Sequence, residues 1–124
     1  MRPRILYIED NFENRMLVKR ILMAEDFDFD EADSAEEGIQ KALQHPPDII
    51  LMDISMPNVD GLTATKRIRA IPELDRVPII AVTANVMRGD REASLRAGCD
   101  GYIPKPIDID RFPGQIMEYL QIGR

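Results

Sequence analysis

Acidic side chains close two short apolar runs of this sequence. Residues 49–52 are followed by Asp53. Residues 5–8 are followed by Glu9 and Asp10. Apolar runs of this length between polar segments are typical of strands that are buried on both faces. Because ligands of open α/β sheets bind beyond the carboxyl ends of the strands, we expect these carboxylates to form part of a site.

Two further short runs end on other polar groups. Residues 79–82 lead to the hydroxyl of Thr83, and residues 101–104 lead to the amine of Lys105. Clustered carboxylates disfavour one another's ionisation unless a cation is present, and a hard divalent cation such as Mg²⁺ suits carboxylate and water ligands. With an amine and a hydroxyl to bind phosphoryl oxygens and a carboxylate as nucleophile, the set is suited to phosphoryl transfer.

Short apolar runs alternate regularly with longer amphipathic stretches. We expect strands over residues 4–9, 28–32, 48–53, 79–83 and 101–104. We expect helices over residues 12–25, from Ser34 to His45, from Leu62 to Ala70, from near Val86 to Ala97, and in a last segment that ends near Leu120. This alternation with short connections implies an α/β fold with parallel strands, right-handed crossovers and helices on both faces of one sheet.

Several residues mark where these elements begin, end or lie. Asn11 is placed to cap the first helix, and Ser34 with Glu37 forms a capping box for the second. Gly98 is expected to end the fourth helix in a left-handed conformation. The strand over residues 28–32 is rich in acids, so we expect it at an edge of the sheet, where charge discourages association with other strands.

Pro113 lies inside the expected last helix. Proline is tolerated only in the first turn of a helix, because it lacks an N–H and its ring clashes with the preceding turn. We therefore expect this helix either to be capped by Asp110 instead of Asp108 or to bend at Pro113.

Length, charge and cysteine content restrict the class of protein. A chain of 124 residues suffices for one core, so we expect one domain over residues 1–124. The net charge of −6 disfavours nucleic acid and anionic membranes as partners. A single cysteine, Cys99, excludes an internal disulfide, fits a reducing cytoplasm and is expected to be a packing residue. The only histidine, His45, is expected in a loop on the side opposite the acids.

Four motifs follow one another along the chain. They are Ile8-Glu9-Asp10-Asn11, the run Leu51-Met52-Asp53-Ile54-Ser55-Met56-Pro57 followed by Asp60-Gly61, then Val82-Thr83-Ala84, and finally Lys105-Pro106. In this order and at this spacing, the chain resembles receiver domains of two-component response regulators over essentially its whole length. Small single-domain regulators and receivers of hybrid kinases are the most similar types. The resemblance implies a flavodoxin-like, three-layer (βα)5 fold, doubly wound, with a five-stranded parallel sheet in the order 2-1-3-4-5.

The resemblance also implies roles for the strand-end residues. Asp53 would be the phosphoacceptor, and its donor a phosphohistidine on a histidine kinase or a histidine phosphotransfer protein. Asp10 and Asp53 would bind Mg²⁺ directly, together with the backbone carbonyl of Ser55, and Glu9 would bind it through water. Mn²⁺ is expected to substitute for Mg²⁺. Lys105 would pair with Asp53 and then with a phosphoryl oxygen.

A conformational switch is implied as well. Thr83 would move to donate its hydroxyl to the phosphoryl group, and Tyr102 would rotate inward to fill the space. These movements would alter the surface formed by the fourth helix, fifth strand and fifth helix. Without such a switch, Tyr102 would be a half-buried strand residue with a wet hydroxyl. The Lys105–Pro106 peptide bond is expected to be cis. Four residues are expected to flank the phosphorylation site: Ser55, Met56, Ala84 and Asn85.

Two other functions remain open on the sequence. A phosphohydrolase with an aspartate nucleophile needs similar groups. Such enzymes resemble one another in a second Asp two residues after the nucleophile, where this chain has Ser55, and their acidic pair comes late in the chain, unlike Glu9 and Asp10. A degenerate receiver would only bind partners and would not need the intact set. We expect a signalling phosphoacceptor, not an enzyme, that acts on an unidentified protein target and is a complete small regulator.

Overall fold

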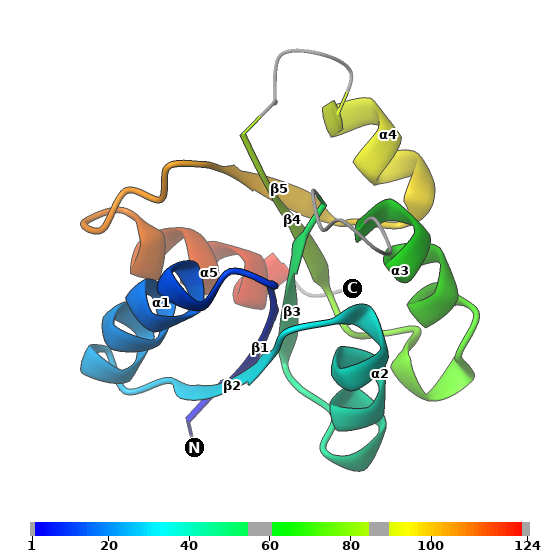
Figure 1. Ribbon diagram of the computed structural model, residues 1–124, viewed down its shortest axis with the longest axis horizontal. Coiled ribbons are helices and arrows are strands. Elements are labelled where there is room, and N and C mark those ends of the chain that lie inside the picture. The colour runs from blue at the N-terminus through cyan, green and yellow to red at the C-terminus, as the bar shows by residue number, and fades with distance from the viewer. Residues whose placement is uncertain (1, 55–60, 85–89, 123–124) are drawn as a thin grey trace.

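The computed structural model describes residues 2–54, 61–84 and 90–122, and in these ranges strands alternate with helices from end to end (Figure 1). The strands are β1 Arg4–Ile8, β2 Asp28–Ala32, β3 Ile49–Asp53, β4 Ile79–Thr83 and β5 Gly101–Pro104. The helices are α1 Phe12–Ala24, α2 Ala35–Gln44, α3 Gly61–Arg69, α4 Asp90–Ala97 and α5 Phe112–Ile122, with a short 3-10 helix, η1, at Pro72–Leu74.

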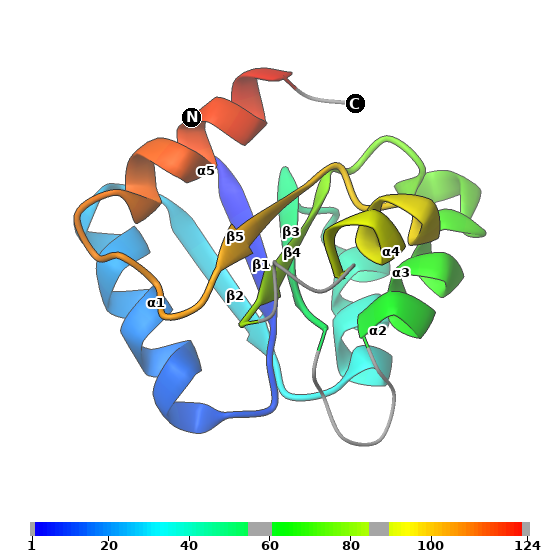
Figure 2. The same ribbon diagram turned by 90° about the horizontal axis from the view of Figure 1, so that it is seen from above.

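The strands form one parallel sheet in the order β2-β1-β3-β4-β5, which confirms the predicted fold and strand order. Helices α1 and α5 cover one face of this sheet, and α2, α3 and α4 cover the other (Figures 1 and 2). The acid-rich strand β2 lies at an edge, as its composition predicts. The central strand β3 is therefore enclosed between two helical layers.

Successive residues of each strand pack on opposite faces of the sheet. In β1, Ile5 and Tyr7 belong to the core beneath α1 and α5, whereas Leu6 and Ile8 belong to the core beneath α2 and α3. All four side chains are buried. Burying a side chain of this size contributes about 1.5–3 kcal/mol relative to leaving it exposed. The strands are therefore held from both sides, and so are the residues at their carboxyl ends.

The pairing register aligns the polar strand ends. The last residue of β1 pairs with the fourth residue of β3, so Glu9 comes level with Asp53. Thr83 pairs with the last residue of β5, and Lys105 follows at the same end of the sheet. The backbone N–H of Lys105 donates to the carbonyl oxygen of Thr83 at 2.7 Å. Residues from four separate parts of the sequence thus meet at one edge of the sheet.

The predicted caps of the first two helices are present. The side chain of Asn11 accepts a hydrogen bond from the backbone of Asn14 at 2.8 Å. Ser34 accepts one from the backbone of Glu37 at 3.2 Å. The carboxylate of Glu37 reaches back to the N–H of Asp33 at 3.0 Å, one residue before the position that the capping box predicts. Both helices therefore begin where the sequence places them.

Helix α5 begins at Phe112, two residues after Asp110. The prediction that Asp110 caps this helix is therefore wrong. The carboxylate of Asp108 accepts hydrogen bonds from the N–H groups of Asp110 at 3.1 Å and Arg111 at 3.3 Å, and this turn precedes the helix. Pro113 is then the second helical residue, where the absence of an N–H breaks no bond within the helix. Pro113 thus lies in the first turn, the part of a helix in which proline is tolerated.

The structure tests the expectations for Gly98, Cys99 and His45. Gly98 ends α4 with φ of 116°, as predicted. Cys99 is buried, and His45 is exposed where α2 ends. The predicted start of the fourth helix at Val86 lies outside the described residues. No helix in the described ranges is both long and apolar enough to cross a membrane.

Candidate functional site

Three carboxylates gather where β1 and β3 end. One oxygen each of Glu9, Asp10 and Asp53 lies within 4.8 Å of the others. Glu9 and Asp53 are buried, and Asp10 is exposed. The Oε2 atom of Glu9 is buried and has no hydrogen-bond partner among the described residues. Three hard oxygen donors, one of them with an unsatisfied buried atom, fit a divalent cation such as Mg²⁺, which keeps several waters as its other ligands.

Lys105 supplies the positive charge of the cluster. Its Nζ lies 3.1 Å from Oε1 of Glu9 and 3.3 Å from Oδ1 of Asp53. The residue belongs to the segment directly after β5, and the peptide bond between Lys105 and Pro106 is cis. One ammonium group thus contacts two acids at the carboxyl ends of two different strands.

The charges of the cluster shift one another's ionisation. Burial, together with the nearby Asp53 carboxylate, raises the pKa of Glu9 from 4.5 to about 7, although Asn14 and Lys105 counteract the shift. Burial acts to lower the pKa of Lys105, but the carboxylates of Asp53 and Glu9 outweigh it, so the pKa of Lys105 is raised. Lys105 therefore remains charged beside the acids, whereas Glu9 is easily protonated when no cation is bound.

Two residues that the sequence reasoning missed hold the Glu9 side chain. The hydroxyl of Tyr7 donates to Oε1 of Glu9 at 3.2 Å, and the amide Nδ2 of Asn14 donates to the same oxygen at 2.7 Å. Tyr7 stands two residues before Glu9, so the two side chains leave the same face of the strand. A tyrosine in an otherwise aliphatic run, two positions before an acid, is the signal that could have identified it.

The other predicted residues lie close to the same edge or outside the described ranges. Thr83 is buried at the end of β4, and Ala84 after it is exposed. Tyr102 is half-buried in β5 and packs against the core beneath α2 and α3. The hydroxyl of Tyr119 donates to the backbone oxygen of Tyr102 at 3.0 Å, which ties α5 to β5. Ser55, Met56 and Asn85 lie outside the described residues.

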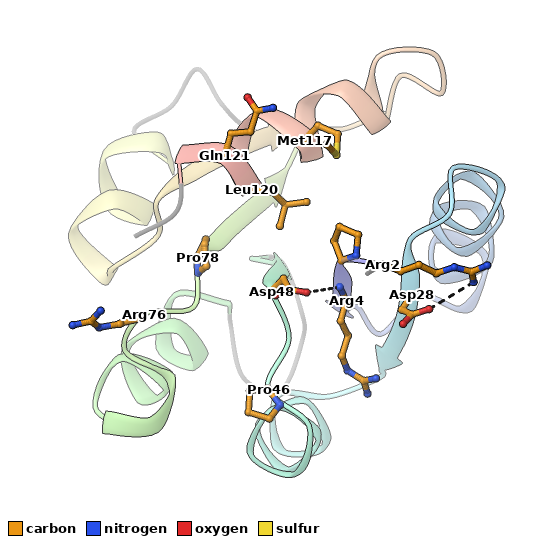
Figure 3. A pocket seen from close by; sticks show the side chains of 11 residues that line it. Arg2, Arg4, Asp28, Pro46, Asp48, Arg76, Pro78, Met117, Leu120 and Gln121 are labelled. Atoms are coloured by element: carbon orange, nitrogen blue, oxygen red, sulfur yellow. Dashed lines mark hydrogen bonds and ion pairs between the residues drawn. The ribbon is translucent and has the colours of Figure 1, made fainter.

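Two hollows differ in their relation to these acids. A hollow of about 350 Å³ adjoins the site and is lined by Asn14, Leu17, Ala84, Lys105, Pro106 and Ile107. A larger hollow of about 810 Å³ is lined by Arg4, Asp48 and Pro78, which lie at the amino ends of the strands, and by Met117 and Leu120 of α5 (Figure 3). The larger hollow is therefore at the opposite end of the sheet from Asp53. The smaller one lies beside the acids, because Asn14 and Lys105 line it.

Comparisons with known proteins agree with this geometry. The family model of the response regulator receiver domain matches residues 5–117. The polar-differentiation response regulator DivK of Brucella ovis is 40% identical over 120 residues, which cover 97% of this chain and 98% of DivK.

Solved structures give the same result. The receiver domain of the sensor histidine kinase PA1611 from Pseudomonas aeruginosa, solved with a magnesium ion in its active-site cleft, is 33% identical with a TM-score of 0.88. The match covers 98% of this chain and 99% of that one. A CheY-like response regulator receiver domain protein from Methanospirillum hungatei is 27% identical with a TM-score of 0.89, covering 98% of this chain and 96% of that one. This chain therefore belongs to the family of response regulator receiver domains of two-component signalling.

Proposed function

We propose that residues 1–124 act as one phosphoacceptor domain in which Asp53 takes a phosphoryl group from a phosphohistidine. The donor is a histidine kinase or a histidine phosphotransfer protein. The observation that carries this proposal is the position of Asp53: a buried carboxylate at the end of a central strand, within 4.8 Å of two other acids and 3.3 Å from the amine of Lys105. An acid held in this way is fixed in position for attack as a nucleophile.

A divalent cation completes the proposed site. Asp10 and Asp53 would hold Mg²⁺ directly with the backbone carbonyl of Ser55, and Glu9 would hold it through water, with Mn²⁺ as a substitute. The support is the acidic cluster itself and the related PA1611 receiver, which was solved with magnesium in its active-site cleft. When bound, the cation neutralises negative charge on the phosphoryl oxygens.

The residues of the chain perform the remaining steps. An oxygen of the Asp53 carboxylate attacks the phosphorus, the P–N bond of the phosphohistidine breaks, and the imidazole leaves with the electron pair of that bond and takes up a proton. Lys105 moves its ammonium group from the carboxylates to a phosphoryl oxygen. Thr83 donates its hydroxyl to another phosphoryl oxygen. These donors stabilise charge that develops during transfer.

The proposed output is a change at the surface of α4, β5 and α5. Thr83 moves toward the phosphoryl group, and Tyr102 rotates inward, so phosphorylation favours one of two arrangements. A protein partner reads this surface, and the net charge of −6 argues against nucleic acid. We place this signalling function in the cytoplasm, and the domain catalyses only its own phosphorylation and dephosphorylation.

Intact mass after incubation with acetyl phosphate and Mg²⁺ tests the proposal. We expect one phosphoryl group on the wild type and none on Asp53→Asn. The variant Asp48→Asn is the matched control, because Asp48 precedes the same strand at its other end, and it should gain the phosphoryl group normally. Absence of the adduct from the wild type contradicts the proposal. Rapid turnover of unrelated phosphomonoesters would instead establish the phosphohydrolase.

A further inference from the structure

The hydroxyl of Tyr7 is buried directly beside the acid cluster. The Tyr7 side chain has no exposed surface, and the other residues of β1 in the core are aliphatic. A buried hydroxyl is costly unless it forms a hydrogen bond, and the Tyr7 hydroxyl donates to Oε1 of Glu9 at 3.2 Å. The Tyr7 hydroxyl is therefore a buried donor to Glu9.

Helix α1 adds a second neutral donor to the same oxygen. Nδ2 of Asn14 lies 2.7 Å from Oε1 of Glu9. The helix is fixed at this point, because Asn11 caps its first turn and Arg15 donates to the backbone oxygen of Glu9 at 2.8 Å. Glu9 is thus held through both its main chain and its side chain.

The two oxygens of Glu9 have different surroundings. Oε1 accepts from Tyr7, Asn14 and Lys105, whereas Oε2 is buried without a hydrogen bond among the residues that the structure describes. A carboxylate with one oxygen fully occupied and the other unsatisfied is prevented from rotating and has one acceptor left for a metal-bound water.

We propose that Tyr7 and Asn14 are positioning residues that lock Glu9 with Oε2 available to the divalent cation, and that they thereby set the affinity for Mg²⁺. This inference rests on the proposed metal site. Two features make these residues suited to the task. Both donors are uncharged, so they hold the carboxylate without repelling a cation. Both also differ from Lys105 in that the proposed mechanism does not require them to leave Glu9 for a phosphoryl oxygen.

The test is a titration of the full chain with MgCl₂ at fixed pH, followed by amide chemical shifts in ¹H–¹⁵N NMR spectra without any phosphodonor. We expect Tyr7→Phe and Asn14→Ala each to weaken Mg²⁺ binding roughly tenfold, as for other residues that orient metal ligands. Tyr119→Phe removes a hydroxyl from the same fold away from the acids and should bind Mg²⁺ like the wild type. The spectra also report whether each variant is folded.

A double-variant cycle separates positioning from general damage. In a Glu9→Gln background, adding Tyr7→Phe should cause no further loss of Mg²⁺ affinity, because the residue acts through the Glu9 carboxylate. Wild-type affinity in both Tyr7→Phe and Asn14→Ala, or an equal loss from Tyr7→Phe in the Glu9→Gln background, overturns the inference while the metal site stands. Failure of the wild type to bind Mg²⁺ overturns the metal site and the inference together.

Discussion

The ammonium nitrogen of Lys105 lies 3.3 Å from Oδ1 of Asp53, although the two residues are 52 positions apart in the chain. The contact arises because β3 and β5 end at the same edge of the sheet, and Lys105 directly follows β5. It joins the proposed acceptor to the group that would receive the phosphoryl charge. The electrostatic part of the proposed mechanism depends on this pair.

Replacing Lys105 by Met tests that pair. We expect phosphorylation by acetyl phosphate to slow by roughly 100-fold, the usual effect of removing one donor that stabilises developing charge. Mg²⁺ binding should persist, because the three acids remain. The rate is followed by intact mass. Lys66→Met, which removes an exposed lysine of α3, is the control. Equal rates for Lys105→Met and the wild type would contradict the assigned role.

The raised pKa of Glu9 predicts that the stability of the metal-free protein depends on pH. Its pKa is about 7 in the folded protein against an ordinary value of 4.5, so the folded state binds the extra proton between these values. The stabilisation that Glu9 adds to the free energy of unfolding is therefore fully present below pH 4.5 and is lost as the pH rises through about 7.

Urea unfolding across this range measures the effect. The free energy of unfolding of the metal-free wild type should fall with rising pH relative to Glu9→Gln, which has no such proton. Adding Mg²⁺ should reduce the fall, because the cation compensates the ionised acids. The same dependence on pH in both proteins would show that Glu9 does not titrate in this way.

Gly61 predicts an effect on Asp53 through the backbone. A Cβ atom at Gly61 would collide with the carbonyl oxygen of Asp53 and lie 2.5 Å from Cα of Ile54. Gly61→Ala should therefore displace the acceptor and slow its phosphorylation roughly ten- to a hundredfold, since small misplacements of reacting groups have effects of this size. We also expect a loss of stability of about 1–3 kcal/mol from overpacking.

Gly114→Ala is the matched control for that substitution. Gly114 lies in α5 with open space around it, so the added methyl group meets no neighbour. The change should leave phosphorylation unaltered and raise stability by about 0.5–1 kcal/mol through the higher helix propensity of alanine. Phosphorylation rates and urea unfolding of the two variants check both expectations. A similar rate for Gly61→Ala and Gly114→Ala would exclude the backbone clash.

The strand ends can be predicted from the sequence because the information is local. Each strand is a short apolar run, and the rule that parallel strands share a carboxyl edge then brings Glu9, Asp53, Thr83 and Lys105 together. The start of α5 is not predicted correctly, because Asp110 and Asp108 are equivalent cap candidates in sequence, and only the structure shows that the Asp108 side chain accepts the N–H groups of the turn before the helix.

Other features depend on the tertiary structure. In the sequence Tyr7 is one member of an apolar run, and the partner of its hydroxyl is evident only once the faces of β1 are known. Asn14 reaches Glu9 only because α1 packs beside the end of β1. The closeness of Gly61 to the backbone of Asp53 depends on where the first turn of α3 packs against the end of β3. No local sequence pattern specifies that position.

The most direct test of the central claim is the position of the phosphoryl group. The protein is phosphorylated with acetyl phosphate and Mg²⁺, the acyl phosphate is reduced with borohydride, and peptides are sequenced by mass spectrometry. Reduction of an aspartyl phosphate converts that residue to homoserine. We predict homoserine at position 53 and at no other acid. Homoserine at Asp10 or at another acid in place of Asp53, or its absence from every peptide, would contradict the account.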